Sequence, residues 1–231
     1  MRAKLPQKPR ATVAPPRLPG VGHVGVFGKT QFGKSTWTRK ALESAELTAA
    51  GRRVFVVDAK GDWRAWCLAA GFMFMTADEL LQAPGYLLTD NVCLMVPDRT
   101  PRAAGRAFRL LARLVHARQI QCVVVAEEVG SYAEFCREEL HTLATQGLPH
   151  CRLLVVAQRP AIVPKTVRSQ LDALVLFHVD EPGDVEAVVE RTRDESLAAV
   201  LPSLPVGAHR AWVAGLVQHP NPIPPKESHP S

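Results

Sequence analysis

The chain has 231 residues, of which 47% are apolar, and its formal net charge is +6. This length allows one sizeable α/β domain, and the apolar content excludes a disordered chain. The longest apolar runs are too short to cross a bilayer, no apolar stretch follows the charged N-terminus, and the five cysteines show no C-x-x-C spacing. We therefore expect a soluble, intracellular protein without a secretory signal, a transmembrane segment or a cysteine-based metal or redox centre.

Proline-rich segments lie at both ends of the chain. Residues 1–20 contain five basic residues, five prolines and no acid, and residues 219–231 contain five more prolines. Such composition favours extended arms over packed elements. We predict a basic, proline-rich arm at 1–20, a single domain at 21–218 and a proline-rich tail at 219–231.

Short apolar runs alternate with helical patterns through the predicted domain. The predicted strands are Val21–Phe27, Arg53–Asp58, Phe72–Met75, Val92–Val96, Cys122–Ala126, Leu153–Ala157, Ala173–His178 and His209–Ala214. The predicted helices are Lys34–Ala50, Asp62–Ala70, Pro101–Ala117, Ser131–Gln146 and Gly183–Arg191. Several strands are apolar throughout, which is typical of parallel strands covered on both faces. We predict an α/β fold with a mostly parallel central sheet flanked by helices and joined by right-handed crossovers.

The turn between the first predicted strand and helix has the pattern G-x-x-x-x-G-K-[ST]. Its residues are Gly28, Lys29, Thr30, Gln31, Phe32, Gly33, Lys34 and Ser35, and Thr36 follows them. The glycines let the backbone approach phosphate oxygens closely, and the N–H groups at the start of the helix bind anions. Lys34 can reach the β- and γ-phosphates, and the Ser35 hydroxyl can bind Mg²⁺. The sequence therefore predicts that this P-loop, with Thr36, binds ATP and Mg²⁺.

Two carboxylates follow the predicted buried strand at Cys122–Ala126. Because parallel strands end at the same edge of a sheet, Glu127 and Glu128 are expected beside the phosphate loop. In that position Glu127 would hold Mg²⁺, partly through water, and Glu128 would orient and deprotonate the attacking water. The alternative is that both acids begin the next helix, where its dipole favours them.

A glutamine, Gln158, ends the next predicted strand and is followed by Arg159-Pro160. A glutamine at a strand end can hydrogen-bond both to water and to the γ-phosphate, and can thereby report the nucleotide state. A loop amide without such a role is the alternative for a single glutamine considered alone.

Together these segments resemble the HerA–FtsK superfamily of P-loop ATPases that pump DNA. The superfamily combines a phosphate loop (Walker A), an acidic strand end (Walker B) and a strand-end sensor like Gln158-Arg159-Pro160. The Asp58-Ala59-Lys60-Gly61 segment also resembles the Asp-x-Lys-Gly turn after its second strand. The resemblance covers about residues 21–180 in the expected order. It implies a RecA-like P-loop NTPase fold of the additional-strand class.

The resemblance also implies partners. Members of the superfamily work on double-stranded DNA as homo-oligomeric rings, here expected to be a hexamer. The small size of the chain is similar to that of the genome-packaging ATPases of membrane-containing icosahedral viruses. We therefore predict an ATP-driven double-stranded DNA translocase that packages a viral genome into a preformed capsid. Its expected location is the host cytoplasm or the virion vertex, with capsid or viral membrane proteins as further partners.

The chain departs from the superfamily pattern at two points. Its Walker B strand ends in Glu127-Glu128 instead of Asp-Glu, which makes the metal contact longer or more indirect. No arginine stands clearly at the position of the finger that one subunit supplies to its neighbour's ATP. The candidates that stay open are Arg152, Arg168, Arg191 and Arg193.

Arginines recur every three or four residues through the predicted helix at Pro101–Ala117 and just before it. They are Arg99, Arg102, Arg106, Arg109 and Arg113. At about 100° per residue they share one narrow arc, opposite the apolar side chains of the same helix. The row is suited to neutralising DNA phosphates or to serving a subunit interface, and a solvated helix face is the alternative.

Two other functions stay open. One is a cellular or conjugative DNA pump of the same superfamily. The other is a nucleotide-switched assembly or secretion ATPase that does not move DNA. Stimulation of ATP hydrolysis by duplex DNA separates this last function from the two DNA pumps.

Overall fold

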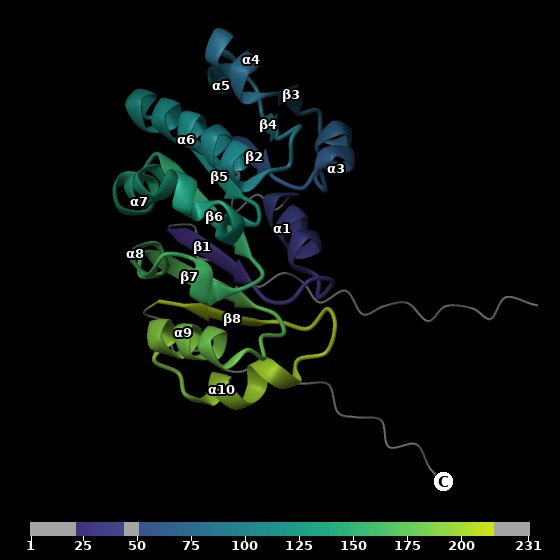
Figure 1. The fold of residues 1–231 in the computed structure, drawn as a ribbon, viewed down its shortest axis with the longest axis vertical. Coiled ribbons are helices and arrows are strands. Elements are labelled where there is room, and N and C mark those ends of the chain that lie inside the picture. The colour runs from purple at the N-terminus through teal and green to yellow at the C-terminus, as the bar shows by residue number, and fades with distance from the viewer. Residues whose placement is uncertain (1–21, 44–50, 215–231) are drawn as a thin grey trace, which may run out of the picture.

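The computed structural model describes residues 22–43 and 51–214, and an eight-stranded sheet forms its centre (Figure 1). The strands are β1 (His23–Phe27), β2 (Arg53–Asp58), β3 (Met73–Met75), β4 (Val92–Met95), β5 (Cys122–Ala126), β6 (Cys151–Ala157), β7 (Leu171–Leu176) and β8 (Arg210–Val213). Their order is β3-β4-β2-β5-β6-β1-β7-β8, and every neighbouring pair is parallel except β7 with β8. The predicted mostly parallel sheet and its eight strands are thus confirmed.

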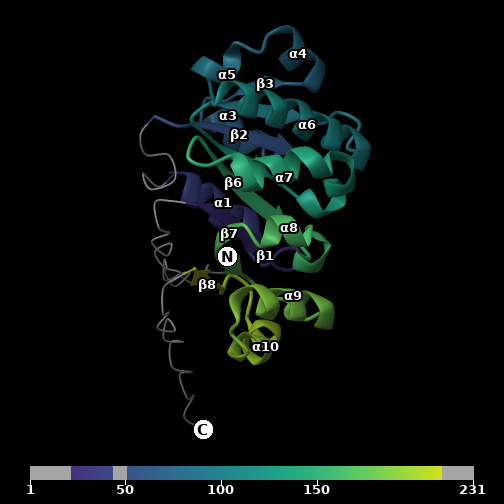
Figure 2. The ribbon, with the colours of Figure 1, turned by 90° about the vertical axis from the view of Figure 1, so that its left-hand side faces the viewer.

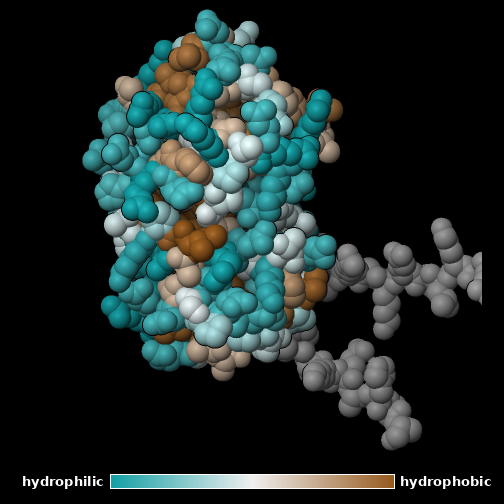
Figure 3. Space-filling view, viewed as in Figure 1, coloured by the Kyte–Doolittle hydropathy of each residue, from teal (hydrophilic) through white to brown (hydrophobic). Residues whose placement is uncertain are grey.

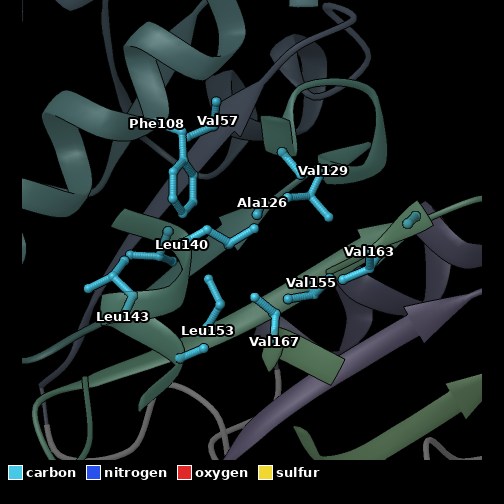
Figure 4. Close-up of a cluster of buried hydrophobic side chains, with 14 of the residues drawn as sticks. Val57, Phe108, Ala126, Val129, Leu140, Leu143, Leu153, Val155, Val163 and Val167 are labelled. Atoms are coloured by element: carbon cyan, nitrogen blue, oxygen red, sulfur yellow. The ribbon is translucent and has the colours of Figure 1, made fainter. Parts of the chain in front are cut away.

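Helices cover both faces of this sheet (Figures 1 and 2). One face carries α1 (Lys34–Glu43) and α3 (Arg64–Ala69), and the other carries α6 (Pro101–Arg118), α7 (Arg137–Gln146), α8 (Lys165–Arg168) and α9 (Pro182–Thr192). Successive strand residues point to opposite faces, so Val56 and Val57 enter two different hydrophobic clusters. In the larger cluster, Phe108 of α6 and Leu140 and Leu143 of α7 pack over the sheet (Figure 4). Burial on both faces explains why the strands read as continuous apolar runs.

The strand order determines which chain segments meet at the carboxyl edge of the sheet. β6 lies between β1, which leads into the phosphate loop, and β5, which leads into Glu127 and Glu128. This inserted strand is the one that defines the additional-strand class, and β6 itself ends next to Gln158. The ends of β1, β6, β5 and β2 are therefore neighbours at one edge.

One predicted helix is wrong in its first half. The segment predicted as a helix over Ser131–Gln146 begins as two 3₁₀ turns, η1 (Val129–Ser131) and η2 (Ala133–Cys136), before α7. The reason is close packing on α6: a Cβ atom at Gly105 would lie 2.4 Å from the Cβ atom of Phe135. The chain follows the surface of α6 there, and a continuous α-helix starts only at Arg137, where the chain still packs against α6.

Several short elements were not predicted. They are α4 (Ala77–Gln82), α5 (Tyr86–Thr89), α10 (Ser196–Val200), η3 (Pro160–Ile162), η4 (Leu201–Ser203) and α8. None exceeds six residues, which is too short for helical periodicity to stand out. Some predictions lie outside the described residues: the arm, the tail, Val21 and the last part of the predicted Lys34–Ala50 helix. The described part of that helix is α1, Lys34–Glu43.

The face of the molecule shown in Figure 3 is mostly hydrophilic with scattered apolar patches. Leu81 of α4 and Leu88 of α5 are among the exposed large apolar side chains, beside the edge strand β3. Within residues 22–43 and 51–214 no helix combines the length and the apolar character that crossing a bilayer requires.

Candidate nucleotide-binding site

The phosphate loop connects β1 to α1 and packs against the segment that follows β7. Gly28 has a φ of +138°, and a Cβ atom there would lie 2.6 Å from the Cβ atom of Phe177. Gly33 has a φ of +107°. The amide of Lys29 donates to the carbonyl of His178 at 2.9 Å. Both glycines therefore occupy backbone conformations that other residues rarely adopt, and Gly28 has no room for a side chain.

Lys34 begins α1, and its ammonium group lies inside the loop. Its Nζ donates to the carbonyl of Lys29 at 2.9 Å. Burial lowers the pKa of the Lys34 ammonium, while the nearby carboxylates of Glu128 and Glu127 act in the opposite direction. The first backbone N–H groups of α1 have no acceptor within the helix. The loop therefore presents N–H groups and a buried ammonium to one concave surface, which suits a phosphate group.

Glu127 is buried directly beside this loop. Glu127 comes directly after β5 and is 2% exposed, and the Ser35 Oγ donates to its Oε1 at 3.4 Å. Its Oε2 is buried without a close hydrogen-bond partner among the described residues, and a side-chain contact from Trp63 stabilises the charged carboxylate only in part. Burial raises the pKa of Glu127 from its usual 4.5 to about 7, and the charge of Glu128 acts in the same direction. A buried carboxylate oxygen without a close partner, next to a serine hydroxyl, is suited to a divalent cation.

Glu128 has different partners from Glu127, because its φ of +52° turns the chain sharply at the end of β5. Its Oε1 accepts a hydrogen bond from Nε2 of Gln158 at 2.9 Å and forms an ion pair with Nζ of Lys60 at 2.9 Å. The structure thus brings the predicted glutamine and the second predicted carboxylate into direct contact. Neither carboxylate lies in the first turn of an α-helix, since α7 begins only at Arg137.

A cleft of about 210 Å³ opens between the phosphate loop and the two acids. It is lined by Thr30, Gln31, Gly33, Lys34, Ser35, Thr36, Lys60, Asp62, Glu127 and Glu128. The predicted residues outside this lining are Gly28, Lys29, Phe32 and Gln158. Lys29 pairs with Asp180 at 2.5 Å, and the ring of Phe32 stacks on that of His178 with centroids 4.6 Å apart. Lys29 and Phe32 therefore connect the loop to the segment after β7.

Lys60 and Asp62 line the cleft but were not among the predicted site residues. They belong to the turn after β2, which the carboxylate of Asp58 closes. It accepts hydrogen bonds from the amides of Gly61, Asp62 and Trp63 at 2.9, 3.0 and 3.2 Å. The sequence signal that could have identified Lys60 was the Asp-x-Lys-Gly pattern. A lysine on a tightly closed turn at a strand end is a candidate for the site at that edge of the sheet.

The predicted arginine row is only partly on one helix. Arg102, Arg106, Arg109 and Arg113 are exposed on α6. Arg99 does not belong to the row, because Thr100 caps α6 and Arg99 has a φ of +47°. The side chain of Arg99 instead packs over Gly61, where a Cβ atom would lie 3.0 Å from its Nη2.

Two of the α6 arginines pair with neighbouring acids. Arg106 forms an ion pair with Asp78 of α4 at 2.5 Å, and Arg113 forms one with Glu139 of α7 at 2.7 Å. Arg102 and Arg109 make no ion pair with any described residue. The exposed face of α6 therefore keeps positive charge that the described residues do not neutralise.

The four candidates for an arginine finger differ in burial and in the contacts that their side chains make with other described residues. Arg152 lies in β6 and is 9% exposed. Arg168 donates to three carbonyl groups of the loop after β6. Arg191 donates to two carbonyl groups and lies over the ring of Trp212, 4.6 Å from its centroid. Arg193 is exposed at the end of α9, so its side chain alone among the four extends into solvent from a helix terminus.

The chain matches no protein-family model and no curated protein, whereas solved structures share its fold. The genome-packaging NTPase B204 from Sulfolobus turreted icosahedral virus 2, in complex with ATP-gammaS, matches with a TM-score of 0.61 at 14% identity, over 84% of this chain and 93% of that chain. VirB4 of Thermoanaerobacter pseudethanolicus matches with a TM-score of 0.63 at 11% identity, over 80% and 85%. The pCW3 conjugation coupling protein TcpA, with ATPgS, has a TM-score of 0.55 at 17% identity, over 84% of this chain and 58% of TcpA.

The identity of these structures to this chain is 11–17%, so the likeness concerns the fold alone. The eight-stranded, mostly parallel sheet with β6 inserted between β1 and β5 agrees with that likeness. This chain therefore shares the P-loop NTPase fold of these structures, as the sequence predicted.

Proposed function

We propose that this protein is an ATPase that uses ATP hydrolysis to move double-stranded DNA, and that its substrate is a viral genome packaged into a preformed capsid. One observation carries the ATPase activity. A single cleft brings together the phosphate loop, the buried lysine and the serine hydroxyl that follow β1 and the two carboxylates that follow β5. These are the groups that phosphoryl transfer from ATP to water requires.

The triphosphate would lie along the loop. The amides from Thr30 to Ser35 and the N-terminus of α1 would bind the phosphate oxygens. Lys34 would move its ammonium from the Lys29 carbonyl, which it now contacts, to the β- and γ-phosphates. This exchange replaces one neutral acceptor by charged ones, which strengthens the hydrogen bonds of the ammonium.

Mg²⁺ fits beside Ser35 and Glu127. The burial and the raised pKa of Glu127 support a carboxylate that needs a nearby positive charge to be stable in its ionised form. No group of three or more His, Cys, Asp or Glu side chains among the described residues is placed to hold a metal ion. The protein ligands would therefore be few, as is usual for Mg²⁺ bound together with nucleotide phosphates. When bound, Mg²⁺ neutralises charge that develops on the phosphates.

Glu128 would orient the attacking water and accept its proton. It is the less buried of the two acids, it faces the cleft, and its position is set by Gln158 and Lys60. Gln158 can donate to Glu128 or turn to the γ-phosphate, and we propose it as the residue that links the nucleotide state to the end of β6.

Movement of DNA is supported by the similar structures and by charge. One similar structure is named as a genome-packaging NTPase, and it shares most of its length with this chain. The exposed arginines of α6 are suited to the phosphate backbone of a duplex, which a motor contacts without reading sequence. We propose a homo-oligomeric ring, a hexamer, in which Arg193 is the preferred candidate for the finger because its side chain is exposed.

Conjugative DNA transfer is a second candidate function. The likeness to the coupling protein TcpA and to VirB4 favours it, at TM-scores of 0.55 and 0.63. A packaging enzyme requires a capsid for productive DNA uptake, whereas a conjugative pump does not, so a packaging assay with purified capsids separates the two.

The first experiment is ATP hydrolysis by the purified protein with and without long duplex DNA, at low and moderate salt. We expect DNA to raise turnover several-fold, and Glu128→Gln to reduce it by about a thousandfold while ATP still binds. Glu186→Gln, which makes the same change on the exposed face of α9, is the control. Turnover that does not respond to DNA would contradict a DNA motor and favour an ATPase activated by a protein partner.

A further inference from the structure

We infer that Lys60 is a positioning residue for Glu128, an inference that rests on the ATPase function proposed above. Lys60 and Gln158 hold one carboxylate oxygen of Glu128 from two sides, which leaves the other oxygen for the attacking water. The inference comes from the strand order and from the two contacts on a single atom.

Both contacts are made to the same oxygen. Nζ of Lys60 and Nε2 of Gln158 each lie 2.9 Å from Oε1 of Glu128. Within residues 22–43 and 51–214 no hydrogen bond reaches Oε2 of Glu128. Two donors on one oxygen restrict the rotation of the carboxylate plane. Oε2 therefore has a defined direction, and it belongs to a residue that lines the cleft.

The two donors come from strands on either side of Glu128. The order β2-β5-β6 places the segment after β2, which carries Lys60, on one flank and the segment after β6, which carries Gln158, on the other. Glu128 follows the middle strand. This arrangement holds the carboxylate between two fixed strand ends, and no single helix or loop provides both contacts.

The turn that carries Lys60 is itself tightly held. The carboxylate of Asp58 accepts three backbone hydrogen bonds from the residues after Lys60. Gly61 has a φ of +84°, and Arg99 packs against its open side. The Lys60 backbone is thus anchored to the end of β2, and its side chain reaches a carboxylate that is 13% exposed. A lysine on a loosely held loop would not direct another side chain in this way.

A different role for Lys60 would be direct contact with the γ-phosphate, because it also lines the cleft. The two roles predict different kinetics. Loss of a phosphate contact weakens binding of ATP relative to ADP and raises KM. Loss of a positioning contact lowers kcat while nucleotide binding is retained.

The test compares Lys60→Met and Lys60→Arg with wild type in kcat, KM, affinity for ATPγS and ADP, and thermal unfolding. We expect Lys60→Met to lower kcat by about 10- to 100-fold, since a misplacement of about 1 Å can have that effect. KM, both affinities and the unfolding temperature should stay close to those of wild type, and arginine should restore part of kcat. Lys165→Met is the matched control, since Lys165 pairs with Glu190 on the surface, outside the cleft.

A double variant tests the shared oxygen. If Lys60 and Gln158 act on one carboxylate, Lys60→Met combined with Gln158→Met should be little worse than the more damaging single variant. An unchanged kcat in Lys60→Met, a raised kcat, or a loss confined to ATPγS affinity would each overturn the inference in an enzyme that is otherwise active. If wild type itself hydrolyses no ATP, with or without DNA, the proposed function is wrong and the inference is wrong with it.

Discussion

At the scale of single residues, the burial of Glu127 is the most unusual feature of the site. A carboxylate at 2% exposure beside the charge of Glu128 is unfavourable in its ionised form, which is why its pKa is raised to about 7. Without nucleotide and cation, the folded protein therefore holds a proton on Glu127 at pH values where the unfolded chain has lost it. The site is stable in this protonated form and would bind a cation more tightly as the proton leaves.

This residue makes the stability of the nucleotide-free protein depend on pH. Between the unfolded value of 4.5 and the folded value of about 7, the folded state binds more protons, so the free energy of unfolding falls as pH rises through this window. Glu127→Gln removes this pH dependence. The free energy of unfolding of the variant, relative to that of wild type, should therefore rise by on the order of 3 kcal/mol between pH 4.5 and pH 8. Urea unfolding in EDTA measures this.

The control for the Glu127 variant is Glu186→Gln, because Glu186 is exposed on α9. It makes the same chemical change without the burial. A stabilisation by Glu127→Gln that is equal at both ends of the pH range would show that Glu127 is not a buried, protonated group in the folded protein.

At the scale of elements, the contact between α6 and η2 explains the largest error of the sequence analysis. Tyr132 is fully buried with its ring 6.1 Å from that of Phe108, and Phe135 reaches the backbone of α6 at Gly105. Glycine inside a helix is usually destabilising, so its presence there indicates that close approach is required. The segment after Glu128 is thereby pulled onto α6, and this contact helps to define the strand end that carries the acids.

Gly105→Ala tests this close packing. Helix propensity alone favours alanine by about 1 kcal/mol. However, the added Cβ atom would lie 2.4 Å from the Cβ atom of Phe135, so we expect net destabilisation of about 1–3 kcal/mol by chemical denaturation. Gly183→Ala is the matched control, since Gly183 lies in the first turn of α9 with open space at its Cβ position. Net stabilisation by Gly105→Ala would contradict the packing described here.

At the scale of the whole molecule, the cleft and the arginine face of α6 are connected through a short physical path. Arg99 packs on Gly61 of the turn that carries Lys60, and α6 begins two residues later at Pro101. The helix has 18 residues and so extends about 27 Å, with its exposed arginines along that length. Packed groups therefore connect the turn beside Glu128 with the start of the arginine face.

Replacing arginines on α6 tests the contact with DNA. We expect Arg106→Gln with Arg109→Gln to lower DNA-stimulated ATP turnover several-fold and to reduce the salt dependence of DNA binding by about two phosphate contacts. Loss of the exposed pair between Arg106 and Asp78 should change stability by less than about 1 kcal/mol. Lys40→Gln with Arg64→Gln, on the opposite face of the sheet, is the control of equal charge. If both double variants behave alike, α6 is a solvated face and not a DNA surface.

Much of the fold followed from the sequence because its signals are local. Short apolar runs identified all eight strands, and the glycine and lysine spacing identified the phosphate loop between β1 and α1. Short helices were missed even where a local signal existed. Thr76 and Glu79 form the capping box that begins α4, which the T-x-x-E pattern indicated.

The partners of the site residues were decided by the tertiary structure. That Lys60 and Gln158 meet on one oxygen of Glu128 depends on β2 and β6 flanking β5, and no periodicity along the chain encodes that order. The same holds for Arg99, which the spacing placed on a helix and which the cap at Thr100 directs to Gly61. The sequence by itself determined which residue types stand at the strand ends, since burial and turn geometry act over a few residues. Only the folded sheet decided which of these ends are neighbours, because contacts between distant segments depend on the order of the strands.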